Sequence, residues 1–283
     1  MGISGPEQHG RKDVWAVGDA YEPYVGRWSR LLAREFVPWL GLPPGGRWLD
    51  AGCGTGALTR LVLGLASPAL VLGIDRSEGF VRYARQQVRD DHAMFAVGDA
   101  QALPVSDGSC DAVVCGLVLN FIPDQPRALA EMVRVVRSGG VVACYVWDYA
   151  GQMQMMRYFW HAAAALDPEA ARLDEGVRFP VCRPGPLERL FAESGLRGVQ
   201  VRAIDAPTHF RDFDDYWSPF LGGQGPAPGY VMSLSEERRV SLRERIRAAL
   251  PVAEDGSIPL MARAWAVRGF VSGDRDRGYT GSL

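Results

Sequence analysis

The chain has 283 residues, of which 47% are hydrophobic, and 31 basic residues nearly balance 33 acidic ones to give a net charge of −2. This length and apolar content allow one large domain with a substantial core. The near-neutral charge argues against a basic binding surface, so no nucleic-acid partner is expected. No apolar run reaches the roughly 18 residues that span a bilayer, and the first residues are polar, so we expect a cytoplasmic protein without a membrane partner.

The cysteines and histidines argue against a metal site. The five cysteines include no CxxC pair, and the four histidines are far apart in the sequence. Structural zinc sites usually take their ligands from closely spaced pairs, so no metal is expected. Cys110, Cys115 and Cys144 fall in apolar runs, where a thiol usually behaves as a small buried hydrophobe.

Residues 1–20 are predicted to be a flexible segment, and the first element expected after them is a helix. Apolar residues recur there at helical spacing: Trp28, Leu31, Leu32, Phe36, Trp39 and Leu40. This period predicts an amphipathic helix with one buried face. We expect the helix to cover the ligand-binding edge of the domain that follows.

From residue 46 to 147, short apolar runs alternate with helical periods, which indicates βαβ units and a parallel sheet. The expected strands are 47–52, 69–75, 93–99, 110–118 and 141–147, and the expected helices are 58–65, 77–90 and 124–140. In the last helix Asp124 can cap the amino end and Gly139 can end the helix. If the crossovers are right-handed, the carboxyl ends of these strands form one edge, where open α/β sheets bind ligands.

A glycine-rich turn, "LDAGCGTGALTR" at residues 49–60, follows the first expected strand. Gly52, Gly54 and Gly56 permit positive φ and let a ligand approach the main chain. Dinucleotide-binding turns place their third glycine one residue further along, which disfavours an NAD-dependent reductase.

Three acids, Asp50, Asp75 and Asp99, stand at the ends of successive expected strands. Asp75 follows Gly56 by 19 residues, a spacing at which an acid can bind ribose hydroxyls. The three acids and the glycine turn together predict a ligand site at the carboxyl edge of the sheet. The alternative is that these acids only cap turns.

After residue 150 the βα rhythm breaks. Residues 151–182 and 207–250 are expected to be inserted helices and loops above the binding edge, and residues 196–204 and 261–270 are expected to be the last strands. The cluster "GGQGPAPG" predicts a mobile centre in the second insertion. The expected organisation is a leading helix and binding core at 21–150, insertions and last strands at 151–270, and a flexible tail at 271–283.

Four stretches of the core share the motifs of a known family. They are "WLDAGCGTGALTR", "VLGIDRSEGFVRYAR", "VGDAQALPVSDGSCDAVVCGLVLNFIPD" and "ALAEMVRVVRSGGVVACYVWD". They resemble the class I S-adenosylmethionine-dependent methyltransferases, in the ubiquinone/menaquinone-biosynthesis-like (type 11) small-molecule branch. The resemblance implies a Rossmann-like α/β fold with a seven-stranded sheet, helices on both faces and helical lid insertions. It also implies S-adenosylmethionine as cofactor and S-adenosylhomocysteine as its product.

The resemblance implies a cofactor-binding role for one set of residues. They are Tyr24, Arg27, Asp50, Ala51, Gly52, Gly54, Gly56, Asp75, Arg76, Asp99, Ala100, Cys115, Gly116 and Leu119. The first strand end and the turn would hold the methionine part, with Asp50 accepting from its ammonium group. Asp75 would accept from both ribose hydroxyls, and Asp99 would accept from the adenine amino group.

The remaining members of the set would surround the cofactor. Arg76 would lie along the adenine while the Ala100 amide donates to a ring nitrogen, and the main chain at 115–116 with the Leu119 side chain would line the far side. Tyr24 and Arg27 would close over the cofactor carboxylate, although Arg27 has an alternative as a solvated surface residue.

A sulfonium methyl group is already activated, so the family chemistry mainly needs alignment and exclusion of water. A base is needed only for an acceptor that enters protonated, and the candidates are Asp148, His161 and His209. Each has an alternative structural role, a helix-surface position in the case of His161.

The segment "LNFIPD" lacks the Asn/Asp-Pro-Pro-aromatic motif of many amino-group methyltransferases of DNA and protein, which favours a small-molecule acceptor. Six insertion residues could form an aromatic roof over the acceptor or pack the lid: Tyr158, Phe159, Trp160, Tyr216, Trp217 and Phe220. We expect a monomer or homodimer that methylates oxygen or carbon of a small, largely apolar metabolite. The alternative is a protein of the same fold that does not methylate, either a regulator or a pericyclic catalyst.

Overall fold

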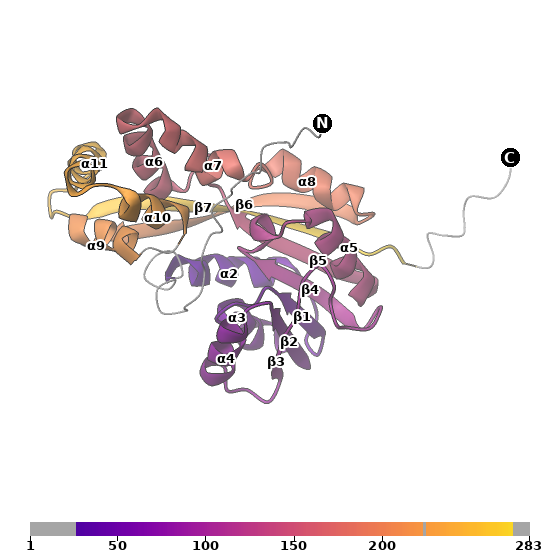
Figure 1. Cartoon of the computed structure of the whole chain (residues 1–283). Coiled ribbons are helices and arrows are strands. Elements are labelled where there is room, and N and C mark those ends of the chain that lie inside the picture. The colour runs from indigo at the N-terminus through magenta and orange to yellow at the C-terminus, as the bar shows by residue number, and fades with distance from the viewer. Residues whose placement is uncertain (1–26, 223–224, 274–283) are drawn as a thin grey trace, which may run out of the picture.

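The computed structural model describes residues 27–222 and 225–273 and is built around one mixed sheet (Figure 1). The sheet has seven strands in the order β3-β2-β1-β4-β5-β7-β6. The strands are β1 (Arg47–Ala51), β2 (Leu70–Asp75), β3 (Ala93–Val97), β4 (Cys110–Gly116), β5 (Val136–Trp147), β6 (Arg197–Phe210) and β7 (Ile258–Phe270). Strands β1 to β5 are parallel, and β7 runs antiparallel between β5 and β6. The predicted α/β fold and its parallel core are therefore confirmed.

The helices of the core lie on both faces of this sheet (Figure 1). They are α2 (Arg27–Trp39), α3 (Ala57–Ala66), α4 (Glu78–Gln87), α5 (Gln125–Val135) and α8 (Pro184–Glu193), with a 3-10 turn η2 (Leu119–Phe121) after β4. Local signals fix several helix starts. The side chain of Ser77 accepts from the Phe80 N–H at the start of α4, and Asp124 accepts from the Arg127 N–H at the start of α5, as expected for N-cap residues.

The largest errors in the predicted boundaries are at the junction of α5 with β5 and at the end of β6. The helix expected to reach residue 140 ends at Val135, because β5 already begins at Val136, which pairs with Cys110 of β4. The sixth strand was expected to end at residue 204 but continues to Phe210, since its last residues pair with β7 as far as Ile258.

The leading helix also differs in position from the prediction. It packs on a face of the sheet, where Phe36 contacts Tyr145 of β5 with ring centroids 4.7 Å apart. Only its first turn reaches the carboxyl edge, where the ring of Trp28 lies 5.2 Å from that of Phe210. The helix therefore flanks the binding edge, and its buried tryptophan belongs to the core.

The lid consists of residues 154–178 and 213–249, which follow the carboxyl ends of β5 and β6. Its elements are α6 (Gln154–Leu166), η3 (Pro168–Leu173), α7 (Glu175–Arg178), α9 (Phe213–Trp217), η4 (Ser218–Gly222), α10 (Pro226–Ser233) and α11 (Glu236–Ala249). These helices gather at one end of the long strands β6 and β7 (Figure 1). The glycine and proline cluster continues into α10, and its prolines lie in the first turn of that helix. Proline is tolerated there because the first N–H groups of a helix have no partner within the helix.

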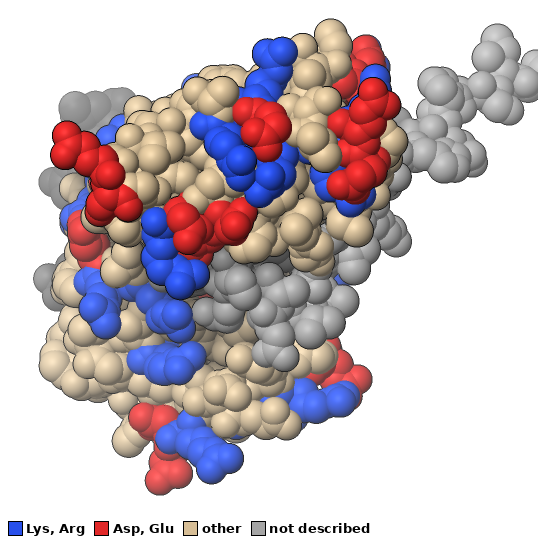
Figure 2. Space-filling view, turned by 90° about the vertical axis from the view of Figure 1, so that its left-hand side faces the viewer, with Lys and Arg blue, Asp and Glu red and all other residues tan. Residues whose placement is uncertain are grey.

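All five cysteines are free and buried, as predicted for Cys110, Cys115 and Cys144. On the face that carries the lid, acidic and basic groups are interspersed (Figure 2). Within residues 27–222 and 225–273, no helix is both long and apolar enough to cross a bilayer. The expected flexible segment 1–20 and most of the tail lie outside the described residues.

Candidate active site

The glycine turn connects β1 to α3 through three glycines with positive φ. Gly52 has φ 78°, Gly54 has φ 50°, and Gly56, which directly precedes α3, has φ 81°. The N–H groups of Gly52 and Cys53 both donate to the Ile74 carbonyl of β2, at 2.7 and 3.0 Å. A Cβ atom at Gly52 would lie 2.6 Å from Val118, whereas one at Gly54 would meet nothing within 4 Å. The turn is therefore closely packed at its start and open above Gly54, where a ligand can reach the main chain.

Asp75 joins this turn to the start of α4. Its Oδ2 accepts from the Gly54 N–H at 3.0 Å, and its Oδ1 accepts from the Ser77 N–H at 2.8 Å. Burial raises the pKa of this carboxyl, and the two backbone donors and the charge of Arg76 oppose that rise. The carboxylate lies beside the open side of the turn, held in one orientation by two main-chain donors.

Asp50 lies one residue before the end of β1 and is 1% exposed. Its Oδ2 accepts from the Thr59 hydroxyl at 2.6 Å. Among the described residues, its Oδ1 has no hydrogen-bond partner. Burial raises the pKa of Asp50 to about 7, against the Thr59 hydrogen bond and with a contribution from the Asp75 charge. A buried oxygen without a donor is costly, and an ammonium group of a ligand would supply that donor.

Asp99 is exposed just beyond the end of β3. Its carboxylate accepts from the Gln101 N–H at 2.9 Å and from Gln101 Nε2, and these bonds lower its pKa. The charge of Arg76 favours the ionised form of both Asp75 and Asp99, so this exposed arginine lies near both acids. Ala100 follows Asp99 and is half-buried. The structure therefore brings these strand-end residues to one edge of the sheet.

The end of β4 makes a tight turn at the same edge. A Cβ atom at Gly116 would lie 2.7 Å from the Tyr145 hydroxyl, and Leu117 has φ 60°. The turn leads into η2, where Leu119 is fully buried and Asn120 is 4% exposed. Within the described part of the chain, the Asn120 Nδ2 has no hydrogen-bond partner. Sequence reasoning did not assign Asn120 to the site, although a polar residue in an apolar run at a strand end was a usable signal.

The three candidate bases do not lie together. Asp148 directly follows β5, is buried and accepts from the Gln152 N–H at 2.9 Å. His161 is exposed on α6. His209 is exposed and lies within β6, opposite Pro259 of β7, so the expectation that residue 209 belongs to the insertion at 207–250 is wrong. Of the three, Asp148 alone is buried at the carboxyl edge.

A buried acid of the lid, Glu175, was missed from the sequence. It is 2% exposed, and the Trp160 Nε1–H donates to its carboxylate. Burial raises the pKa of Glu175 to about 7. Burial is the main cause of the raised pKa of the Cys182 thiol, and the charges of Asp148 and Glu175 add to the rise. Both acids therefore lie near this cysteine. A glutamate in the short helix α7 carries no sequence signal of such burial.

The aromatic residues of the lid pack mostly against each other. The Phe159 and Phe220 rings are stacked with centroids 4.6 Å apart, and the Tyr216 hydroxyl donates to the Met155 carbonyl at 2.8 Å. Trp217 is 5% exposed. This arrangement supports the packing alternative for these rings. Tyr24 lies outside the described residues, and Arg27 is the first residue of α2.

Comparisons with known proteins identify the family of this chain. A family described as "Methyltransferase domain" matches residues 49–144. A demethylmenaquinone methyltransferase of Roseiflexus castenholzii is 33% identical over 180 residues, which cover 58% of this chain and 74% of that protein. This chain belongs to the class I S-adenosylmethionine-dependent methyltransferases. It is an enzyme of the ubiquinone/menaquinone-like branch, and its cofactor is S-adenosylmethionine.

Solved structures agree with the fold of this methyltransferase. Phosphoethanolamine N-methyltransferase 2 of Haemonchus contortus, solved with S-adenosylmethionine, has a TM-score of 0.55 at 16% identity and covers 90% of this chain and 56% of its own. The [4+2]-cyclase SpnF has a TM-score of 0.51 at 18% identity, covering 87% of this chain and 82% of its own. At such identities the likeness concerns the fold alone.

Proposed function

We propose that the methyltransferase binds S-adenosylmethionine at the carboxyl ends of β1 to β4 and methylates oxygen or carbon of a small, largely apolar metabolite. The observation that carries the cofactor site is the Oδ1 of Asp50, a residue that is 1% exposed; this oxygen has no hydrogen-bond partner within residues 27–222 and 225–273. It lies at the turn whose open side is above Gly54. A buried carboxylate oxygen without a donor fits the methionine ammonium, and the open glycine fits a ligand in contact with the main chain.

The other cofactor roles follow from position along the edge. Asp75 has both oxygens fixed by main-chain donors and retains lone pairs for two ribose hydroxyls. Asp99 and the Ala100 amide would meet the adenine, with Arg76 beside it. The β4 end, namely the main chain at 115–116 and Leu119, would close the far side, and Tyr24 and Arg27 would contact the cofactor carboxylate.

When bound, S-adenosylmethionine supplies an activated methyl group, so the protein has to align the acceptor and exclude water. Asp148 is placed to take the proton of an acceptor hydroxyl or enol, because it is the buried acid at the end of β5. The Asn120 Nδ2, in η2 after the end of β4, has no hydrogen-bond partner in the part of the chain that the structure describes, and it is placed to donate to an acceptor oxygen. Neither exposed histidine is needed for this chemistry.

Aromatic rings around the ends of β4 and β5 support a flat, apolar acceptor. The Phe179 ring lies 5.2 Å from that of Phe121 in η2 and 6.1 Å from that of Tyr149 after β5. Rings at this distance offer apolar walls for another ring. The name of the Roseiflexus relative also points to a quinone, and a reduced quinone would bring a hydroxyl proton to Asp148.

Calorimetry with S-adenosylhomocysteine tests the cofactor site. Asp75→Asn should weaken binding at least tenfold, because a bond to a charged acceptor contributes about 1.5–3 kcal/mol. Asp90→Asn, an exposed acid outside the site, is the matched control and should bind like the wild type. Equal affinity in all three proteins would contradict the proposed cofactor site.

Transfer of a labelled methyl group tests the acceptor class. The label from S-adenosylmethionine should enter a demethylated naphthoquinol or a phenol and should not enter histamine. Incorporation only into the amine would contradict the proposed acceptor. Cofactor binding without incorporation into any member of the panel would favour the non-methylating alternative.

A further inference from the structure

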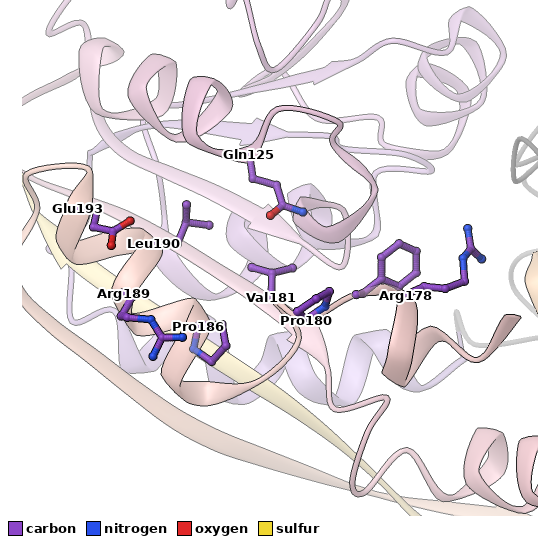
Figure 3. Close-up of a pocket in the computed structure, with 9 residues that line it drawn as sticks. Gln125, Arg178, Pro180, Val181, Pro186, Arg189, Leu190 and Glu193 are labelled. Atoms are coloured by element: carbon purple, nitrogen blue, oxygen red, sulfur yellow. The ribbon is translucent and has the colours of Figure 1, made fainter. Parts of the chain in front are cut away.

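A hollow of about 320 Å³ lies between the start of α5 and the helix α8. We call it the α5–α8 groove. Its size is at the lower end of the roughly 300–1,000 Å³ of small-molecule sites, which suits a small ligand. In Figure 3, Gln125 of α5 faces Val181 and Pro180 of the segment that leads into α8.

The groove has an apolar floor and charged ends. Phe179, Val181 and Leu190 supply apolar lining, and Arg189 and Glu193 of α8 supply charge. Figure 3 shows Arg189 on α8 and Arg178 on the other side of Pro180 and Val181. Two arginines against one glutamate give the lining a net charge of +1, which is complementary to an anion.

Arg189 has the freer guanidinium of the two arginines. In the described part of the chain it has no ion pair or hydrogen bond, whereas Arg178 lies with its guanidinium 5.1 Å from the Phe179 ring centroid. An arginine beside an apolar floor is suited to a ligand that is both apolar and anionic, because its fork binds carboxylate, sulfonate or phosphate oxygens.

One wall of the groove is also a wall of the proposed acceptor site. Phe179 lines the groove and contacts Phe121 and Tyr149, which follow the carboxyl ends of β4 and β5. A ligand in the groove is therefore one aromatic ring away from those strand ends.

We propose that the α5–α8 groove binds the distal end of the methyl acceptor, and that this end consists of an apolar body with one anionic group. The inference rests on the proposed function for the identity of the ligand as the acceptor. The groove's preference for an amphipathic anion is a property of its own lining and can be measured without cofactor or turnover.

Two fluorescent probes test this preference: 8-anilinonaphthalene-1-sulfonate and N-phenyl-1-naphthylamine, which has the same rings without the sulfonate. Arg189→Gln should weaken the sulfonate about two- to fivefold, the range of an exposed ion pair, and leave the neutral probe unchanged. Glu193→Gln should strengthen the sulfonate by a similar factor. Leu190→Ala should weaken both probes, because both use the apolar floor.

Arg89→Gln removes an exposed arginine between α4 and β3 and is the matched control for charge. It should leave both titrations unchanged. The proposal is overturned if Arg189→Gln and Glu193→Gln do not change the affinity of the sulfonate, or if both probes change in parallel in these two variants. Calorimetry with S-adenosylhomocysteine on the same proteins reports separately on the cofactor site, so the two failures are distinguishable.

Discussion

The cofactor edge and the lid build their surfaces in different ways. At the edge, main-chain geometry decides the shape: Gly52 and Gly54 take positive φ, and Asp75 is fixed by two backbone N–H groups. In the lid, side-chain packing decides the shape, as in the stacked rings of Phe159 and Phe220. Main-chain geometry of this kind leaves a residue pattern in the sequence, whereas side-chain packing depends on contacts between segments that are far apart in the sequence. The comparison predicts that changes in the lid affect stability and that changes at the edge affect binding.

The largest effect is expected for Phe220→Ala in the lid. The Phe220 ring is fully buried and contacts the rings of Phe159, Tyr216 and Trp217. Its removal should lower the free energy of unfolding by about 3–5 kcal/mol. Urea unfolding measures this loss, and the affinity of the folded variant for S-adenosylhomocysteine should stay within twofold of the wild type.

Leu221→Ala is the neighbouring control, because Leu221 is 45% exposed. Its effect on the free energy of unfolding should stay within about 0.5 kcal/mol. Equal losses in the two variants would show that the ring cluster does not hold the lid together.

Particular residues show what the sequence could predict. The strands β1 to β5, the glycine turn and its acids were predicted because their period, spacing and chemistry are local. The extent of β6 beyond residue 204 was not, since it depends on pairing with β7 as far as Ile258. Glu175 could not be found either, because its burial beside Trp160 arises from packing between α6 and α7.

The second-largest effect is expected in the glycine turn, where two valine substitutions distinguish backbone strain from loss of cofactor binding. Gly54 and Gly45 both have positive φ, 50° and 81°, and a Cβ atom at either would meet nothing within 4 Å. Valine at either position should lower the free energy of unfolding by about 1–2 kcal/mol. Gly54→Val should also weaken S-adenosylhomocysteine at least about tenfold, because its side chain would fill the space above the turn. Similar calorimetric affinities in both variants would remove the turn from the cofactor site.

The third prediction compares two buried acids, Asp50 at the edge and Glu175 in the lid, whose pKa values are both raised to about 7. The folded state favours the protonated form of each. The stability that each contributes is therefore fully present below about pH 4 and is lost as pH rises through about 7. Asp50→Asn and Glu175→Gln should each flatten the fall in the free energy of unfolding between these pH values.

Binding should distinguish the two acids. The cofactor ammonium favours ionised Asp50, so the affinity for S-adenosylhomocysteine should rise between pH 6 and 8, by at most about tenfold per pH unit. Calorimetry across this range should show the rise in the wild type and in Glu175→Gln but not in Asp50→Asn. A pH dependence that survives in Asp50→Asn would mean that another group carries it.

The smallest effects are expected for the two exposed histidines. His161 lies on the solvent side of α6, and His209 lies in β6 close enough to Asp255 to lower the pKa of that acid. Neither is buried at the strand ends, so His161→Gln and His209→Gln should change the rate of methyl transfer less than twofold.

Asp148→Asn should lower kcat at least about tenfold with a hydroxyl acceptor, since a positioned base typically contributes 10²–10⁴-fold. Steady-state kinetics with an acceptor from the labelled-methyl panel measures all three variants. A large loss in either histidine variant, with Asp148→Asn still active, would show that this histidine is the base and that Asp148 is not.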